Sequence, residues 1–327
     1  MSLNAFVLVT IALAFGFFNG LHDSSNVVAT VISTRALSPR RALWLAAIAN
    51  GVGPLIFGVA VATTIGHEVV AEEAVTLSVV YASLLAAIAW NVVTLLVGIP
   101  SSTSHALIGG IVGAVWAGFG VESILMGGVT KILLALFLSP ILGMITGYYI
   151  VKLSYFLAQG ATPHVNIWFK RGQLLTATTL ALSHGTNDAQ KTMGIIALGL
   201  VATGTINTFS IPTWVILASA VAMGAGTLFG GWSLIRTLGG RFYRVRPVHG
   251  FGAQTASSAV ILGAALLGGP VSTTHVVSSA IVGAGTADRI SKVRWGVFNN
   301  IVLSWFLTIP AAAAMGALLY LLIEALF

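Results

Sequence analysis

The chain has 327 residues, of which 57% are hydrophobic and only 7% are charged. Soluble domains carry about 25% charged residues, so this composition excludes a soluble protein and indicates an α-helical protein with many membrane crossings. The net charge of +7 does not indicate nucleic-acid binding, because the basic residues lie in short loops, and the absence of cysteine excludes disulfides and thiolate metal sites.

Five apolar segments are predicted in the first half of the chain, each close to the roughly 20 residues that cross a bilayer as a helix. They cover residues 3–34, 42–64, 76–98, 100–118 and 124–151. A polar block at 19–26 (NGLHDSSN) interrupts the first segment, and a second block at 100–105 (PSSTSH) opens the fourth. We expect the first block to break its helix, because glycine and small polar residues weaken a helix and free its backbone carbonyls.

The second half repeats this pattern. A linker leads to apolar segments at 174–202, 212–235, 250–267, 271–284 and 294–325, and the polar blocks recur at 183–190 (SHGTNDAQ) and 270–275 (PVSTTH). Gly20 matches Gly185 at an offset of 165 positions, and Pro100 matches Pro270 at an offset of 170. We therefore predict an N-terminal transmembrane repeat over 1–151, a cytoplasmic linker over 152–172 and a C-terminal transmembrane repeat over 173–327. A duplicated polar site within lipid is typical of secondary transporters.

Loop charges predict that the second copy is inverted in the membrane. The loop after the second segment holds Glu68, Glu72 and Glu73, whereas its counterpart at 236–249 holds four arginines. Basic loops face the cytoplasm, so both termini lie outside, and an odd number of segments per copy inverts the second copy. The predicted fold is an all-α polytopic membrane protein with two inverted-topology repeats of about five helical segments each. Broken helices or re-entrant hairpins meet at mid-membrane, and the total of ten segments is taken to within two.

Asp23 and Asp188 occupy the same position in the two copies of the first block. A charged aspartate within a bilayer is costly unless it has a partner or lies in a water-filled cavity. Carboxylates and the backbone carbonyls freed by a helix break bind cations. We therefore predict a symmetric pair of sites for a cation or a proton. Local capping of a helix junction is the alternative, but it does not explain why the aspartate is duplicated at matched depth.

The Pro-Ser/Thr blocks suit an anion. Each proline ends one helix, and the hydroxyls lie in the first turn of the next helix, where free N–H groups and the helix dipole favour negative charge. Ordinary N-capping by serine and threonine is the alternative. Lys191 either attracts the anion or neutralises Asp188, and the sequence does not separate these roles. The histidines of the blocks either relay protons, donate to an anion or bond to neighbouring helices: His22, His105, His184 and His275.

The blocks at 20–26 (GLHDSSN) and 185–191 (GTNDAQK), with the two Pro-Ser/Thr blocks, resemble the paired signatures of the inorganic phosphate transporter (PiT) family. The resemblance covers nearly the whole chain and has both repeats in order. It implies a symporter of the cell membrane that imports inorganic phosphate coupled to sodium or protons. The first copy has His22 where the signature usually has asparagine, which leaves the coupling ion open. Some members of the family are believed to carry sulfate, which leaves the oxyanion open.

The residues of the blocks and the resemblance together define the expected site. The candidate ligands of the coupling ion are Asp23, Asp188, Asn26, Asn187, His22, Thr103 and Thr273, and the two aspartates bind sodium if sodium is the coupling ion. The candidate ligands of phosphate are Ser101, Ser102, Thr103, Ser104, Ser272, Thr273, Thr274, Lys191, Gly20 and Gly185. No cofactor is expected besides the coupling ion. The expected partners are phosphate and the lipid bilayer, with a homodimer as one option.

Two other functions compete with symport. An intramembrane hydrolase would use Ser, His and Asp, but Ser104 directly precedes His105, and adjacent helix positions do not face each other. A single catalytic triad also gives no reason to duplicate every element, so we do not expect an enzyme. A passive anion channel would place buried aspartates beside the anion that they repel, and a requirement for an ion gradient separates it from a symporter.

Overall fold

The computed structural model describes residues 2–67, 69–269 and 271–326. Within these ranges the named elements are all helices, accompanied by an isolated β-bridge between Val70 and Ile124. The predicted all-α fold is therefore confirmed. Glu68 and Pro270, which the sequence analysis used, lie outside the described residues.

The helices fall into two series in the same order. The first series is α1 (Leu3–Ser33), α2 (Pro39–Phe57), α3 (Ala60–His67), α4 (Leu77–Val97), α5 (Thr103–Phe119) and α6 (Met126–Leu157). The second series is α7 (Val165–Ala202), α8 (Thr213–Phe229), α9 (Trp232–Arg236) with the π-helical turn η3 (Thr237–Arg241), α10 (Pro247–Leu266), α11 (Thr273–Asp288) and α12 (Trp295–Leu326). Only 158–164 lie outside helices in the predicted linker, because α6 and α7 extend into it from both sides.

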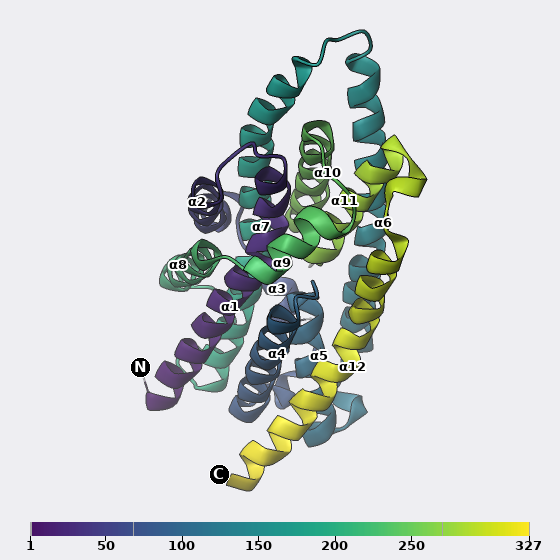
Figure 1. The fold of residues 1–327 in the computed structure, drawn as a ribbon. Coiled ribbons are helices and arrows are strands. Elements are labelled where there is room, and N and C mark those ends of the chain that lie inside the picture. Colours follow the sequence, from purple (N-terminus) through teal and green to yellow (C-terminus); the bar gives the residue numbers. More distant parts are fainter. Residues whose placement is uncertain (1, 68, 270, 327) are drawn as a thin grey trace.

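The two series interlock (Figure 1). Helices α4 and α5 form the hairpin of the first series, and α10 and α11 form the hairpin of the second. Helix α5 packs mainly against α12, and α11 packs mainly against α6, so each hairpin packs against the last helix of the other series. Helices α1 and α2 of the first series also pack against α7 and α8 of the second. Both termini lie at one end of the molecule, and the connection between α6 and α7 lies at the opposite end. This arrangement is consistent with two inverted repeats that each contain an odd number of crossings.

Helices α1 and α7 run unbroken through their polar blocks, so the predicted helix breaks at these blocks are wrong. The glycines of the blocks instead allow neighbouring helices to approach closely. A Cβ on Gly20 would lie 2.2 Å from the carbonyl oxygen of Met223 in α8, and a Cβ on Gly185 would lie 2.0 Å from that of Asn50 in α2. Small residues commonly permit such contacts between membrane helices.

The helical breaks lie at the Pro-Ser/Thr blocks, where the chain reverses between α4 and α5 and again between α10 and α11. Gly98 and Gly268, with φ of 75° and 72°, adopt the left-handed conformation that these turns need. Helix α5 has 17 residues and α11 has 16, which gives lengths of about 24–26 Å at 1.5 Å per residue. Each is shorter than the roughly 30 Å hydrocarbon core, which fits the re-entrant hairpins that the sequence offered as one option.

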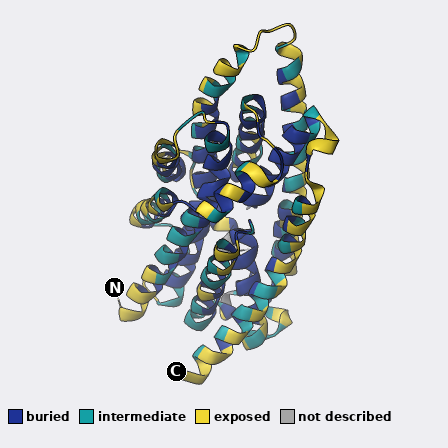
Figure 2. Cartoon of the chain, viewed as in Figure 1, coloured by how far each residue is buried: buried dark blue, intermediate teal, exposed yellow. Residues whose placement is uncertain are grey.

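Four helices in the described part of the chain are long and apolar enough to cross a membrane, namely α1, α4, α6 and α12. A fifth span results if α8 and the segment Trp232–Arg241, which meet at a bend of 60°, are counted together. The sequence predicts ten apolar segments, which is more than the number of described helices that meet these criteria, because several helices are too short or too polar. In α6 and α12 only 28% and 22% of the most apolar window is buried, and Figure 2 shows exposed residues along both helices. The bilayer covers such faces in a multi-pass membrane protein.

Candidate ion and substrate site

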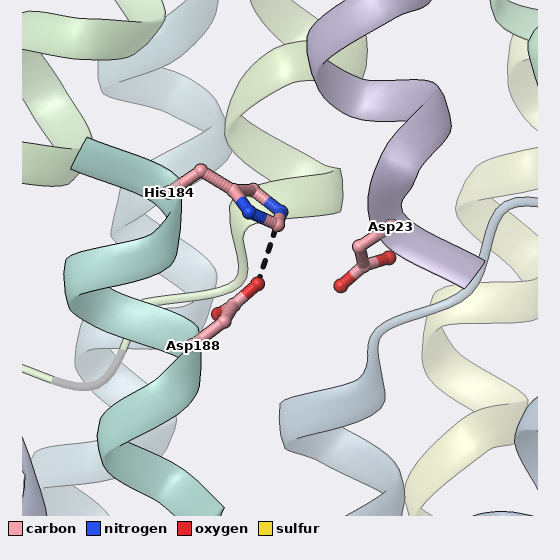
Figure 3. A group of neighbouring side chains, drawn as sticks. All are labelled: Asp23, His184 and Asp188. Atoms are coloured by element: carbon pink, nitrogen blue, oxygen red, sulfur yellow. Dashed lines mark ion pairs between the residues drawn. The ribbon is translucent and has the colours of Figure 1, made fainter. Parts of the chain in front are cut away.

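The two predicted aspartates meet at the centre of the molecule. Asp23 of α1 and Asp188 of α7 are 1% and 0% exposed. Ligand atoms of Asp23, Asp188 and His184 all lie within 4.8 Å of one another. Figure 3 shows the two carboxylates directed toward the space between α1 and α7. Two buried carboxylates at this separation repel each other, so each needs hydrogen-bond donors or a cation.

Asp23 receives donors from both hairpins. Thr103 Oγ1, at the start of α5, donates to Oδ2 over 3.2 Å, and Thr274 Oγ1, at the start of α11, donates to Oδ1 over 3.0 Å. The ring Nδ1 of His22 lies 2.9 Å from Oδ1. Asn26 donates from Nδ2 to Thr274 Oγ1 over 3.1 Å, and its own Oδ1 has no hydrogen-bond partner among the described residues. Asp23 therefore links helix α1 to the hairpin tips of both repeats.

Asp188 has a different set of partners. The Lys191 ammonium forms an ion pair with its Oδ1, and both side chains are fully buried. Thr273 Oγ1 donates to Oδ2 over 2.9 Å, and His184 Nε2 lies 3.0 Å from the same oxygen. The Lys191 ammonium thus lies against the Asp188 carboxylate. This position fits neutralisation of Asp188, which is one of the two roles that the sequence left open.

The hydroxyls predicted to bind phosphate lie at the buried hairpin tips. Ser102 and Ser272 cap their helices by accepting from the backbone N–H of His105 and His275 over 3.1 and 3.3 Å. Ser104 Oγ donates to the carbonyl oxygen of Val271 over 3.4 Å, which joins the two tips. The first turns of α5 and α11 also direct their positive dipole ends toward this region.

Two side chains that the sequence analysis did not single out support the site. Thr94 of α4 lies 3.1 Å from His22 Nε2 and accepts from Ser101 Oγ over 3.0 Å. Trp305 of α12 stacks on His275 at 4.0 Å between ring centroids and donates to the carbonyl oxygen of Pro100 over 3.3 Å. Thr94 is one of several polar residues in the α4 span, which gave only a weak signal, and no signal marked Trp305.

Three predicted ligands make structural contacts. Gly20 lies at the contact of α1 with α8, and Gly185 lies at the contact of α7 with α2. A side chain at either position would clash with the backbone of the neighbouring helix. Asn187 Nδ2 donates to the carbonyl oxygen of Gly269 over 3.3 Å and so holds the second hairpin against α7. Its Oδ1, which has no partner within the described part of the chain, remains for an ion.

The phosphate transporter family model matches residues 19–316, which include all four polar blocks and both halves of the site. The chain belongs to this family. It is 45% identical to a Bacillus subtilis (strain 168) protein named probable low-affinity inorganic phosphate transporter, over 98% of this chain and 97% of that protein. It is 44% identical to a Rhizobium meliloti (strain 1021) protein of the same name, over 96% of this chain and 94% of that protein.

A solved structure has the same fold. The structure, described as the sodium-dependent phosphate transporter, superimposes with a TM-score of 0.89 at 24% identity and covers 100% of both chains. The family match and the relatives confirm the resemblance to the phosphate transporter family predicted from the four blocks, and the chain is a multi-pass membrane protein of a family of phosphate transporters.

Proposed function

We propose that this protein is a secondary active symporter that imports inorganic phosphate together with sodium or protons across the cell membrane. The observation that carries the proposal is the position of Asp23. Its buried carboxylate accepts from Thr103 and Thr274, which belong to the hairpins of opposite repeats. A cation bound there contacts both moving parts at once, as alternating access between inverted repeats requires.

The residues around Asp23 fit a sodium ion. Its carboxylate, the unpartnered Oδ1 of Asn26 and the hydroxyl oxygens of Thr103 and Thr274 are all oxygen ligands, which hard cations prefer. The contact of His22 with Asp23 fits proton coupling equally well. Either ion offsets the carboxylate charge that would otherwise repel phosphate.

Phosphate would lie among the hydroxyls and the N-terminal turns of α5 and α11. These groups are donors without net charge, so they hold an oxyanion without trapping it. The proposed ligands are Ser101, Ser102, Thr103, Ser104, Ser272, Thr273 and Thr274. The same geometry favours transport over hydrolysis, since Ser104 donates to a backbone carbonyl rather than to a histidine ring.

Burial of the site supports alternating access rather than a channel. The hydroxyl ligands at the two tips are at most 4% exposed, and Asp23 and Asp188 at most 1%. The tips also contact each other, through Ser104 and Val271 and through the rings of His105 and His275, whose centroids are 4.6 Å apart. Phosphate can therefore reach the site only when the hairpins move.

The test is uptake of radiolabelled phosphate into proteoliposomes under a sodium gradient, a proton gradient or neither. Asp23→Asn is expected to abolish gradient-driven uptake, whereas Asp288→Asn, which removes a carboxylate at the far end of α11, is expected to retain it. Equal uptake with and without a gradient would contradict symport. Strong inhibition by excess sulfate would show that the oxyanion is not specifically phosphate.

A further inference from the structure

The two half-sites differ at one pair of matched positions. The offset of 165 that aligns Asp23 with Asp188 also aligns Asn26 with Lys191. Asn26 contributes a neutral amide whose Oδ1 has no hydrogen-bond partner in residues 2–67, 69–269 and 271–326. Lys191 contributes an ammonium that forms an ion pair with Asp188. One half-site thus has a free oxygen ligand where the other has a cation.

The position of the ammonium follows from the helix that carries it. Lys191 lies three residues after Asp188 on the unbroken α7, and side chains at this spacing are neighbours on a helix surface. Both side chains are fully buried, so separating them would leave two unpaired charges in a medium of low dielectric constant. The ammonium is therefore held at the carboxylate by the backbone and by the cost of leaving it.

We propose that Lys191 takes the place of a coupling cation at Asp188. The C-terminal half-site then carries its own fixed cation and binds none from solution, whereas the Asp23 half-site binds the exchangeable one. This inference rests on the proposed symport and names the residue that sets its stoichiometry. It also replaces the symmetric pair of cation sites that the duplicated aspartates predicted from sequence.

The charge balance of the site follows directly. The two carboxylates of Asp23 and Asp188 carry two formal negative charges and the Lys191 ammonium carries one positive charge, which leaves one negative charge among these three residues. A single exchangeable cation at Asp23 brings the site to neutrality before phosphate binds. A neutral residue in place of Lys191 would leave a second buried carboxylate without a counter-charge, and a second cation would compensate it.

The test is equilibrium binding of radiolabelled sodium to the purified protein without phosphate. Lys191→Asn, which installs the residue found at the matched position, is expected to bind one more sodium ion per chain than the wild type. Lys191→Arg keeps the positive charge and is expected to bind the same number as the wild type. The double variant Asp188→Asn/Lys191→Asn lacks the carboxylate and is expected to lose the additional ion.

With proton coupling the additional cation is a proton, and proton uptake measured on the same variants replaces the sodium measurement. Lys191→Gln, which is closer to lysine in length, replaces Lys191→Asn if the latter does not give monodisperse protein. Two sodium ions on the wild type, or no additional ion on either amide variant, would overturn the proposal. Weaker phosphate binding without additional sodium would assign Lys191 to phosphate instead. Phosphate uptake by the wild type tests the symport separately.

Discussion

Replacing Gly185 with alanine adds one methyl group at a close helix contact beside the site. The new Cβ would lie 2.0 Å from the carbonyl oxygen of Asn50, whereas ordinary van der Waals contacts are 3.4–4 Å. The obstructing atom belongs to the backbone, so α2 and α7 must separate by about 1 Å or more. Overpacking of this kind costs about 1–3 kcal/mol and occasionally more. We therefore expect Gly185→Ala to lower the melting temperature of the purified protein.

Gly263→Ala is the matched control for this measurement. Gly263 also lies within a helix, α10, but a Cβ there meets nothing within 4 Å. Removing a glycine from a helix interior stabilises it by about 0.5–1 kcal/mol, so the control is expected to melt at or above the wild-type temperature. An unchanged melting temperature for Gly185→Ala would refute the packing role. Unchanged melting with loss of phosphate uptake would return Gly185 to the substrate site, as the sequence predicted.

Three further substitutions separate ion binding, capping and support of the hairpin. Thr274→Val removes a hydroxyl oxygen that is proposed to bind the cation at Asp23, so the cation concentration for half-maximal uptake is expected to rise about tenfold or more. Thr178→Val, at a partly exposed position of α7, is expected to leave this concentration unchanged. Ser272→Ala is expected to cost about 1 kcal/mol of stability as a lost cap, and a rise in the KM for phosphate would show that this serine also binds the anion. Trp305→Phe keeps an aromatic ring near the hairpin but removes the indole donor, so the free energy of unfolding is expected to fall by about 1 kcal/mol. An unchanged free energy of unfolding would contradict the role of Trp305 in supporting the hairpin.

The sequence was most informative where its two copies agree. The offsets between Gly20 and Gly185 and between the Pro-Ser/Thr blocks identified the repeats, and the prolines and hydroxyls located both hairpin turns. Local reasoning failed at the same glycines when it predicted a helix break. A glycine can break a helix or admit a neighbouring helix, and only the positions of α8 and α2 decide between these effects.

Contacts between the repeats could not be predicted from one sequence. The duplication places Thr103 near Asp23 and Thr273 near Asp188 by symmetry, but it does not show that Thr274 also reaches Asp23. That contact depends on how the second hairpin crosses α1, which the packing of α11 on α6 determines. Trp305 has no aromatic counterpart 170 positions earlier, so the repeat gave no reason to single it out.

The packing also defines which parts of the molecule can move together. Helices α4 and α5 pack against α12 in one bundle, α10 and α11 pack against α6 in a second, and α1, α2, α7 and α8 form a third between them. Each hairpin bundle therefore combines helices of both repeats. If the bundles move as units, the contact between the hairpin tips must break during transport, whereas contacts within the central bundle must persist.

Disulfides can test this division, because the chain has no cysteine of its own. Ser104→Cys with Val271→Cys joins residues that touch across the two tips, and oxidation is expected to stop phosphate uptake. Gly16→Cys with Ala222→Cys joins α1 to α8 inside the central bundle. The Cβ positions of this control pair are 3.6 Å apart, within the range for disulfides, and its oxidation is expected to leave uptake intact. Full uptake with the tips linked would mean that phosphate passes without separating the hairpins, which would contradict alternating access at this site.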